Sequence, residues 1–404
     1  MSESVPDGWK SFKLGDVAEE ISDRVDDPSK AGYDRFVGLD HLDSGELTIR
    51  RWGSTADLLS AMKLFKSGDI LIGRRNAYLK RASKAEFDGV CSGDAYVVRE
   101  KSGTIAEGLL PIILNSNSFW DYTIAHASGT MSKRAKWRDL AEYSFLLPSM
   151  DEQRRIATTL WAAEDCIVKG ERFVTAAERA KQVLMLELFS KGIGHTEFKE
   201  IKWIGKVPVA WKIQKVKDFA SVIRGASPRP KGDLRYYNGS VPRLMTEDVT
   251  RDGKWVHARI DSLTEEGAKL SRFLREGSLV IICSGGKDSV GLPGLLSHDA
   301  CIHDGFLALQ NIIKESSNPE FLYYWFLYYQ KTMEQIATHG CAFINLTTDI
   351  ISDLTVTLPP LPEQHQIVAI LTRCDETIAA ARANVVAAKA MKMKMINEML
   401  VPTG

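Results

Sequence analysis

Several features that identify common classes of protein are scarce or absent in this chain of 404 residues. It has six cysteines and no Cys-x-x-Cys spacing, so we expect free thiols. Cys301 and His303 form an isolated pair of candidate ligands, and we expect no metal site there. No apolar run is long enough to span a bilayer, and the N-terminus does not resemble a signal peptide. We therefore expect a cytoplasmic protein with no membrane partner.

The positive and negative charges of the chain balance. The chain has 52 Lys and Arg residues and 52 Asp and Glu residues, which gives a formal net charge of zero. Proteins that simply coat nucleic acid are usually basic, so this class is disfavoured. Local basic loops remain compatible with the composition.

The usual catalytic motifs are absent: there is no G-x-x-x-x-G-K-[ST], no H-E-x-x-H and no G-x-S-x-G. Residues 284–289, SGGKDS, resemble the pyrophosphate loop of the N-type ATP pyrophosphatases. Gly291, Pro293 and Gly294 would break the helix that such a loop needs. We therefore expect no catalysis by this chain and keep an ATP-pyrophosphatase-type enzyme as an alternative. We prefer a contact between Lys287 and a nucleic-acid phosphate.

The chain contains one pattern twice. The sequence LPSMDEQ at residues 147–153 and the sequence LPPLPEQ at residues 358–364 each open a long stretch of helical periodicity. The shift between the two is 211 residues, just over half the chain. Ser149 and Glu152 form a capping-box pair, and Pro362 suits a first helical turn. The sequence thus predicts two long helices with matched beginnings.

Both helical stretches carry the same apolar stripe, in steps of four and three residues, which is typical of a coiled-coil seam. Only Lys181 and Lys392 interrupt it. The seam residues are Ile156, Leu160, Ile167, Val174, Leu184 and Leu188 in the first stretch and Ile367, Leu371, Ile378, Val385, Met395 and Met399 in the second. The stretches are expected to pack together and to leave a groove for a second protein. A coiled-coil scaffold without DNA contact is a further alternative.

The repeat extends into the segments before the helices. Residues 65–72 match residues 274–281, and residues 91–96 match residues 301–306, with offsets of 209 and 210 residues. Both segments read as mixed α/β with many short strands. Residues 109–120 and 319–330 are expected to form corresponding helices. The predicted unit is a globular domain followed by a long helix, present twice.

The two LP-x-x-x-EQ openings, the matched helices and the sequence LFSKGIGH at residues 188–195 resemble the specificity subunits of type I restriction-modification systems. The join IGKVP at residues 204–208, before Trp211, is similar to the start of the second domain in that family. The resemblance covers essentially the whole chain.

This resemblance implies an α+β fold with two mixed α/β target recognition domains and two long helices. The helices would form an antiparallel coiled coil, and the internal duplication would give pseudo-two-fold symmetry. The implied segments are a first target recognition domain at residues 1–146, a central helix at 147–194, a second target recognition domain at 195–357 and a C-terminal helix at 358–404.

The resemblance also implies a function. Each domain would read one half of a bipartite double-stranded DNA target, and the helices would space the domains and dock two modification subunits. Those subunits would bind S-adenosylmethionine and methylate adenine N6, and restriction subunits would join for cleavage. This chain would bind no cofactor. A helix from Glu152 to about Leu188 would be ~55 Å long, against roughly 34–36 Å for one turn of DNA.

Base reading requires Arg, Lys, Asn or Gln at groove edges, and phosphate contacts require basic donors. Loops of both halves contain such residues, with Asn345 as a candidate for a base edge. The candidates in the first domain are Arg74, Arg75, Lys80, Arg81, Lys133, Arg134 and Lys136. The candidates in the second domain are Arg224, Arg229, Lys231, Arg235, Lys287 and Asn345.

Overall fold

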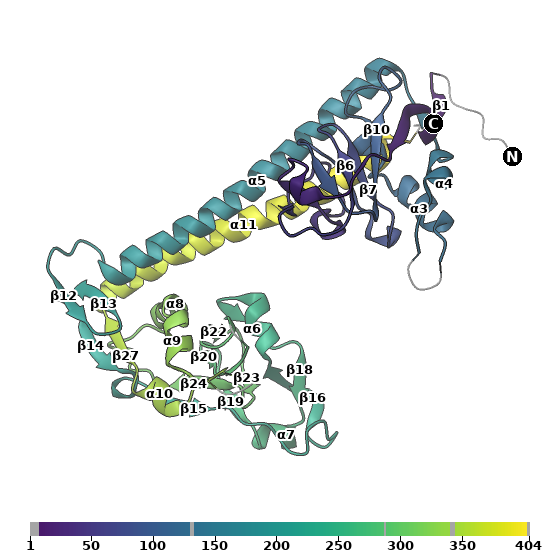
Figure 1. Cartoon of the computed structure of the whole chain (residues 1–404). Helices are drawn as coiled ribbons and strands as arrows, with labels where there is room; N and C mark the ends of the chain where they lie inside the picture. Colours follow the sequence, from purple (N-terminus) through teal and green to yellow (C-terminus); the bar gives the residue numbers. More distant parts are fainter. Residues whose placement is uncertain (1–7, 130–132, 287, 340–343, 402–404) are drawn as a thin grey trace. The chain divides into compact units, whose positions relative to one another are not determined.

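The computed structural model describes residues 8–129, 133–286, 288–339 and 344–401. The chain divides into two compact units, each of which is described by itself (Figure 1). The first unit comprises Met1–Val174 with Ala380–Gly404, and the second comprises Thr175–Ala379. Both combine small sheets with helices, so the predicted α+β class is confirmed.

The first unit contains two main sheets. One is antiparallel, in the order β2 (Ala18–Ile21), β10 (Ala95–Glu100), β7 (Ile70–Gly73) and β8 (Ala82–Lys84). The other has the order β3 (Arg24–Val25), β6 (Met62–Phe65), β9 (Gly89–Cys91), β4 (Arg35–Val37) and β5 (Gly53–Ser54), in which β4 and β9 are parallel. A third pair joins β1 (Lys10–Lys13) to β11 (Ser144–Leu147). The helices are α1 (Leu14–Val17), α2 (Leu110–Ile113), α3 (Asn117–His126) and α4 (Trp137–Ala141), with 3-10 turns at Pro28–Lys30, Leu39–His41 and Ala77–Leu79.

The second unit repeats this plan. One sheet has the order β15 (Ser221–Arg224), β24 (Phe306–Gln310), β20 (Leu279–Ile282), β22 (Pro293–Leu296) and β17 (Trp255–Val256). Another has the order β18 (Asp261–Leu263), β16 (Tyr237–Leu244), β23 (Ala300–Ile302) and β19 (Arg272–Leu274). The remaining strands are β14 (Lys212–Lys215) with β27 (Thr355–Leu358), β12 (Phe198–Ile201) with β13 (Gly205–Pro208), and β21 (Ser284–Gly285), β26 (Ile344–Asn345) and β25 (Thr338–His339). The helices are α6 (Thr246–Asp252), α7 (Glu265–Lys269), α8 (Pro319–Tyr328), α9 (Gln330–Ile336) and α10 (Thr348–Ser352), with a 3-10 turn at Val216–Asp218.

The two units share a strand order. The run β2-β10-β7-β8 corresponds to β15-β24-β20-β22, and the parallel pair β4/β9 corresponds to β16/β23. The pair β1/β11 likewise corresponds to β14/β27. One predicted helix differs: residues 109–120 do not form a single helix, because the chain bends between α2 and α3, where Ser116 caps the start of α3.

The central strand of each main sheet is buried on both faces. In β7, Ile70 and Ile72 belong to the core beneath the long helices, and Leu71 belongs to the core between the sheets. In β20, Ile281 and Ile282 divide between two cores in the same way. Continuous apolar strands of this kind are expected where both faces of a sheet are covered.

Two long helices follow the two domains in the chain. Helix α5 (Met150–Ser190) contains no proline and a single glycine, and α11 (Leu361–Met399) begins with Pro362 in its first turn and is rich in alanine. Both compositions favour a helix. Helix α5 ends before Gly192, which has a φ of +64°. A side chain at that glycine would collide with Glu363, so glycine is required there.

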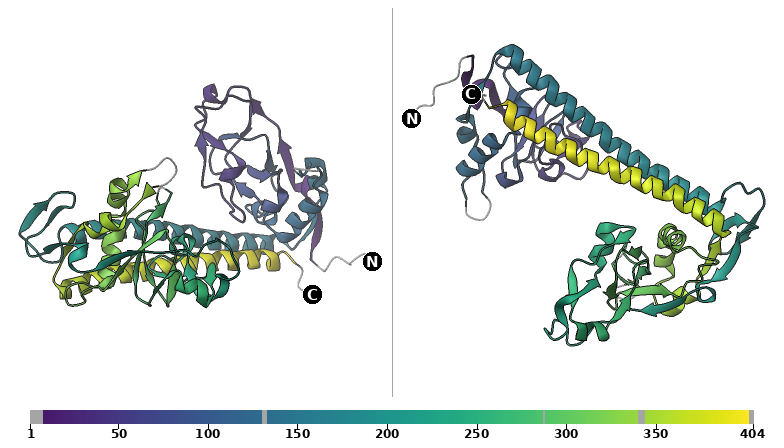
Figure 2. Two further views of the ribbon diagram at one scale, coloured as in Figure 1. Left: turned by 90° about the horizontal axis from the view of Figure 1, so that it is seen from below. Right: turned by 180° about the vertical axis from the view of Figure 1, so that it is seen from behind.

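In the first unit, the beginning of α5 packs antiparallel against the end of α11 (Figure 2). Lys392 lies in this interface with its side chain 3% exposed, and its Nζ is 2.5 Å from Oε2 of Glu164, which is also 3% exposed. Arg50 of the globular domain contacts the same carboxylate. The lysine that interrupts the predicted seam therefore has a buried counter-charge.

The second unit contains the equivalent ion pair. Lys181 of α5 contacts Asp375 of α11, and Tyr324 of α8 donates a hydrogen bond of 2.7 Å to the same carboxylate. The shift from Glu164 to Asp375 and from Lys181 to Lys392 is again 211 residues. The repeat therefore supplies each lysine with the carboxylate of the other helix.

The seam residues surround these ion pairs. In the first unit the structure buries Ile156, Leu160 and Ile167 and half-buries Val174, Val385, Met395 and Met399. In the second it buries Leu188, Ile367, Leu371 and Ile378 and half-buries Leu184. Fully burying such a side chain contributes about 1.5–3 kcal/mol relative to leaving it exposed.

A glutamine ties each globular domain to the start of its helix. Gln153 accepts a hydrogen bond from the backbone N–H of Ala106 at 3.0 Å and donates to the carbonyl of Pro148 at 2.9 Å. Gln364 accepts from Asn318 and donates to Pro359 in the same manner. The predicted capping box forms only in part, since Ser149 accepts from the backbone of Glu152 at 3.4 Å while the Glu152 carboxylate binds Arg155.

Removing the carboxylate of Glu164 should destabilise the first unit more than removing the ammonium of Lys392. The variant Glu164→Gln leaves Lys392 without its buried counter-charge, while Arg50 keeps Glu46 and Glu171. Breaking a buried pair in this way typically costs about 3–5 kcal/mol. Lys392→Met should cost less, because Glu164 keeps Arg50. Urea unfolding followed by circular dichroism measures both, with Lys394→Met at an exposed site of the same helix as the control. A control as unstable as Glu164→Gln would contradict this assignment.

Candidate nucleic-acid interface

In the first unit, three arginines meet at one carboxylate. Asp94 lies in the turn before β10, and its carboxylate oxygens are 3.5 Å from Arg74, 3.7 Å from Arg75 and 3.4 Å from Arg134. The Asp94 side chain is 24% exposed, whereas that of Arg134 is 51% exposed. The acid is therefore less exposed than the three arginine side chains around it.

Backbone contacts bring these residues together. Arg74 follows β7 directly, and its N–H donates to the carbonyl of Asp94 at 3.0 Å. The segment with Arg134 lies against the same turn, because Ala135 donates to the carbonyl of Arg74 at 2.9 Å. The buried Tyr96 hydroxyl donates to the carbonyl of Ala135 at 3.0 Å and so holds that segment from beneath. Two separate loops thus present one basic surface.

The other candidates of the first domain are placed differently. Lys133 is exposed and adjoins the cluster through a backbone hydrogen bond from Asn76. Lys80 turns to Asn117 of α3, with its Nζ 3.3 Å from the amide oxygen. Arg81 is half-buried, and Lys136 is exposed at the start of α4. The structure therefore joins the two sequence clusters through Arg74, Arg75 and Arg134.

The second unit has an acidic residue in the corresponding turn, before β24. The carboxylate of Asp304 accepts a hydrogen bond from Ser227 at 2.6 Å and lies 3.4 Å from Arg229. The backbone carbonyl of Asp304 accepts from Nε of Arg224 at 2.9 Å. Arg224 also reaches Oδ1 of Asn345 at 3.5 Å. Three of the predicted residues therefore surround this turn.

The charge at this turn is set by its neighbours. The hydrogen bond from Ser227, assisted by the charge of Arg229, holds the pKa of Asp304 below its usual range. Burial lowers the pKa of His303, and the nearby charge of Arg243 lowers it further. At neutral pH the turn therefore carries an ionised carboxylate and a neutral imidazole.

The remaining candidates of the second domain lie apart from this turn or outside the description. Arg235 forms an ion pair with Asp233 at 2.7 Å, and Lys231 is exposed. Lys287 lies outside the described residues. Asn345 was expected in a loop but belongs to β26, where it pairs with Ser284 of β21. That pairing places the start of the SGGKDS segment in a small sheet, and the next regular element is the strand β22.

Arg134 and Asn345 occupy equivalent places in the two domains. Each forms an antiparallel backbone pairing with an earlier residue, Arg134 with Ser128 and Asn345 with Thr338. Each precedes a short helix, α4 or α10. The residues after them make the same backbone contact, since Leu346 donates to the carbonyl of Cys283 at 2.8 Å as Ala135 does to that of Arg74. Their offset is 211 residues.

Sequence reasoning did not include Asp94 and Asp304 among the candidates. Both lie in segments that match between the halves, residues 91–96 and 301–306. The match between the two segments therefore marked both residues. They were not selected because the candidates were chosen for positive charge. In the described ranges, no group of three or more His, Cys, Asp or Glu residues could hold a metal ion.

Comparisons with known proteins show which proteins this chain is similar to. A family model described as the type I restriction modification DNA specificity domain matches residues 208–387. The putative type I restriction enzyme MjaX specificity subunit of Methanocaldococcus jannaschii is 22% identical over 98% of this chain and 93% of its own. The type I restriction enzyme EcoDI specificity subunit of Escherichia coli is 28% identical over 41% of this chain and 38% of its own. A chain solved in work on complex assembly and conformational transition of the type I R-M system shares the fold, with a TM-score of 0.63, 20% identity and coverage of 98% and 99% of the two chains.

Residues 208–387 match the DNA specificity domain of type I restriction-modification systems, and nearly the whole chain is similar to the specificity subunits of such systems. It is a DNA-specificity component and not the catalyst of its system. The family resemblance seen in the sequence is therefore confirmed, and neither alternative function has support. None of the helices within the described part of the chain is long and apolar enough to cross a membrane.

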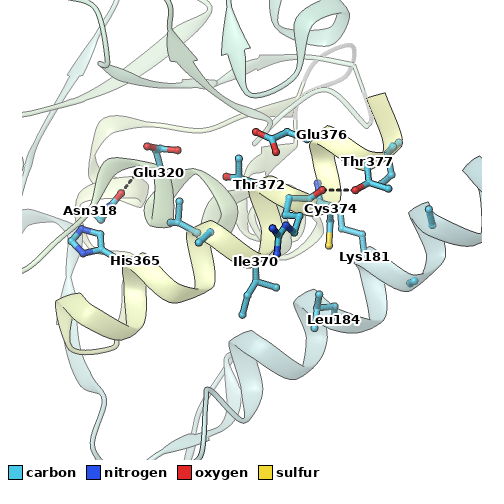
Figure 3. Close-up of a pocket in the computed structure, with 16 residues that line it drawn as sticks. Lys181, Leu184, Asn318, Glu320, His365, Ile370, Thr372, Cys374, Glu376 and Thr377 are labelled. Carbon is cyan, nitrogen blue, oxygen red and sulfur yellow. Dashed lines mark hydrogen bonds between the residues drawn. The ribbon is translucent and has the colours of Figure 1, made fainter. Parts of the chain in front are cut away.

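This specificity subunit also has grooves along its helices. In the second unit, a groove of about 1010 Å³ lies between α5, α11 and the start of α8. Figure 3 shows Lys181 and Leu184 entering it from α5, with Ile370 on α11 and Glu320 on α8. Its wall combines apolar side chains with His365 and several polar groups.

The first unit has a second groove, of about 440 Å³, between α5 and α11. Phe173, Gly170 and Val385 line it, and the Phe173 residue is 53% exposed. Val386 and Met391, also on α11, are 68% and 58% exposed. Large apolar side chains exposed together often mark a protein interface. The helices therefore have more apolar surface than their own packing covers.

Proposed function

We propose that this specificity subunit directs adenine-N6 methylation to a bipartite sequence in double-stranded DNA. Each globular domain reads one half of the target. The supporting observation is that both units gather arginines around an acidic turn at the equivalent end of equivalent sheets, before β10 and before β24. Two similar readers in one chain suit a target with two halves.

The composition of the turns suits DNA. Arginine donates to phosphates and to guanine, and asparagine recognises adenine edges. The basic residues gather locally in a chain whose formal net charge is zero. Binding by such a chain depends on these local surfaces, because its overall charge supplies no attraction to DNA.

The helices would space the two readers and dock two modification subunits. The grooves along α5 and α11 and the exposed Phe173 and Val386 provide surface for these partners. The modification subunits would bind S-adenosylmethionine, and restriction subunits would complete the assembly for cleavage. The solved chain of similar fold comes from work on complex assembly of a type I R-M system. The segment boundaries 1–146, 147–194, 195–357 and 358–404 remain the proposed functional division.

Exchange of one domain should change one half of the target. We expect that replacing residues 1–146 with the corresponding domain of another family member, and adding cognate modification subunits, changes one half of the methylated motif. The other half should persist, because the second domain is intact. Mapping of methylated adenines in host DNA measures this. A motif unchanged in both halves would contradict the proposal.

The Asp94 cluster should contribute to the salt dependence of binding. Arg74→Ala and Arg75→Ala should each weaken binding and lower the slope of log K against log salt by about 0.9 for each phosphate that the variant no longer neutralises. Arg51→Ala is the matched control, since Arg51 pairs with Asp43 elsewhere in the same domain. Titration of the complex with a duplex at several salt concentrations measures the slopes. Slopes that match the control would remove both arginines from the interface.

The groove of the first unit should be needed for partner docking. Phe173→Glu places a charge on this surface and should abolish co-elution with modification subunits in size-exclusion chromatography, while circular dichroism stays unchanged. Thr158→Glu adds the same charge at an exposed position of α5 outside the groove and should elute as the wild type does. Normal assembly by the Phe173 variant would rule out this groove.

A further inference from the structure

We propose that Arg134 and Asn345 are the equivalent base-discriminating residues of the two domains, and that Asp94 and Arg224 are the positioning residues that orient them. This inference rests on the proposed DNA-reading function. It adds which side chain in each domain distinguishes one base from another, and what holds that side chain in place.

The first argument is structural equivalence. Arg134 and Asn345 lie at the same point of the fold: each pairs antiparallel with an earlier segment, lies against the end of a central strand and precedes a short helix. Both are types of residue that read base edges in the major groove. The globular halves otherwise differ through most of their loops, so agreement in place and in chemical type points to one shared task.

In the first domain, Asp94 holds Arg134. One carboxylate oxygen is 3.4 Å from Nη2 of Arg134, and the same oxygen is 3.5 Å from Arg74. Because the acid is less exposed than Arg134, it restrains the guanidinium from the protein side and leaves its outer edge accessible. A guanidinium held in this way loses less conformational entropy when it meets a base.

In the second domain, Arg224 performs the equivalent task. Its Nε donates to the carbonyl of Asp304 at 2.9 Å, and its Nη2 lies 3.5 Å from Oδ1 of Asn345. The contact orients the amide so that its oxygen faces Arg224. The amide nitrogen is then directed away from that contact. Asparagine pairs with adenine through both amide atoms, so the oxygen must accept from Arg224 and from the base together, as its two lone pairs allow.

The chemistry of the two residues predicts the bases. Arginine makes its commonest specific contact with O6 and N7 of guanine, and asparagine contacts N6 and N7 of adenine. The half-site read by the first domain should therefore contain a guanine that depends on Arg134. The other half-site should contain an adenine that depends on Asn345.

The acid also limits indiscriminate binding. Three arginines without a counter-charge would attract any phosphate backbone. Asp94 lowers the net charge of the cluster and makes binding depend on the geometry of the contact. Its removal should thus weaken discrimination and strengthen binding to unrelated DNA, two effects that simple unfolding does not produce together.

The experiment uses the full chain assembled with its modification subunits. The probes are duplexes that carry the motif methylated by the wild-type complex, with each base pair replaced in turn. For Asp94→Asn, discrimination at one guanine position in one half-site should fall about ten-fold, and binding to an unrelated duplex should increase. For Arg224→Lys, which keeps the charge but loses the fork of donors, discrimination should fall at one adenine position in the other half-site.

Matched variants separate this role from a structural one. Asp43→Asn and Arg275→Lys alter ion pairs elsewhere in the same two domains and should leave every position unchanged. Asp94→Glu should restore part of the discrimination. Arg134→Asn and Asn345→Arg should each alter the preferred base at a single position of their own half-site.

The outcomes distinguish the two proposals. If the wild-type complex methylates no bipartite motif, the proposed function fails. If the wild type is specific but Asp94→Asn and Arg224→Lys discriminate as it does, the positioning roles are overturned. If Arg134→Asn and Asn345→Arg keep the original preferences at every position, the base-discriminating roles are overturned.

Discussion

A lysine within an apolar helix seam must meet a carboxylate, and this requirement constrains the helix pair in both units. Lys392 finds Glu164, and Lys181 finds Asp375. If one helix slipped past the other by a turn, the lysine and the carboxylate would be buried without each other. Burying unpaired charges costs far more free energy than a mismatch of apolar side chains. Apolar stripes alone tolerate alternative registers, whereas a single buried polar contact selects one. Because the repeat supplies both ion pairs, the same register is specified in each unit independently.

The register matters because the globular domains are attached to the helices by specific contacts. In the first unit, Gln153 binds the backbone at Ala106, and Lys392 also donates to the carbonyl of Gly45. In the second unit, the Glu363 carboxylate accepts from the N–H of Ile193 and from Nε1 of Trp211, which joins the end of α5 to the start of α11. Each domain is thus fixed to its helix segments through buried polar groups. The sheet of each domain, and the turn before β10 or β24, are therefore held in a fixed position on the helices.

Patterns that repeat along the chain could be predicted from the sequence, and contacts between distant segments could not. The helix openings, the heptads and the buried strands β7 and β20 follow from local periodicity, and the family followed from the motifs. The break between α2 and α3 was missed, although Asn115 and Ser116 interrupt the apolar run there and Ser116 caps the start of α3. The roles of Asp94 and Arg224 depend on turns that only the folded sheet brings near Arg134 and Asn345. The sequence identifies the basic residues but does not show which of them are available to bind DNA. Arg235, for example, already forms an ion pair with the nearby Asp233.

The two domains show how one framework can carry different reading chemistry. Both place an acidic residue in the turn before the central pair of strands, but the arginines reach it from opposite sides. In the first domain they come from the end of β7 and from the segment before α4. In the second, Arg224 comes from the end of β15, on the other flank of β24. In the second domain, the position equivalent to that of Arg134 can therefore be occupied by Asn345. The acidic residue of the turn keeps its place in both domains, while the side chains that donate hydrogen bonds around it differ. The preferred base can therefore change through substitutions in the loops, while the sheet and its contacts with the helices stay the same.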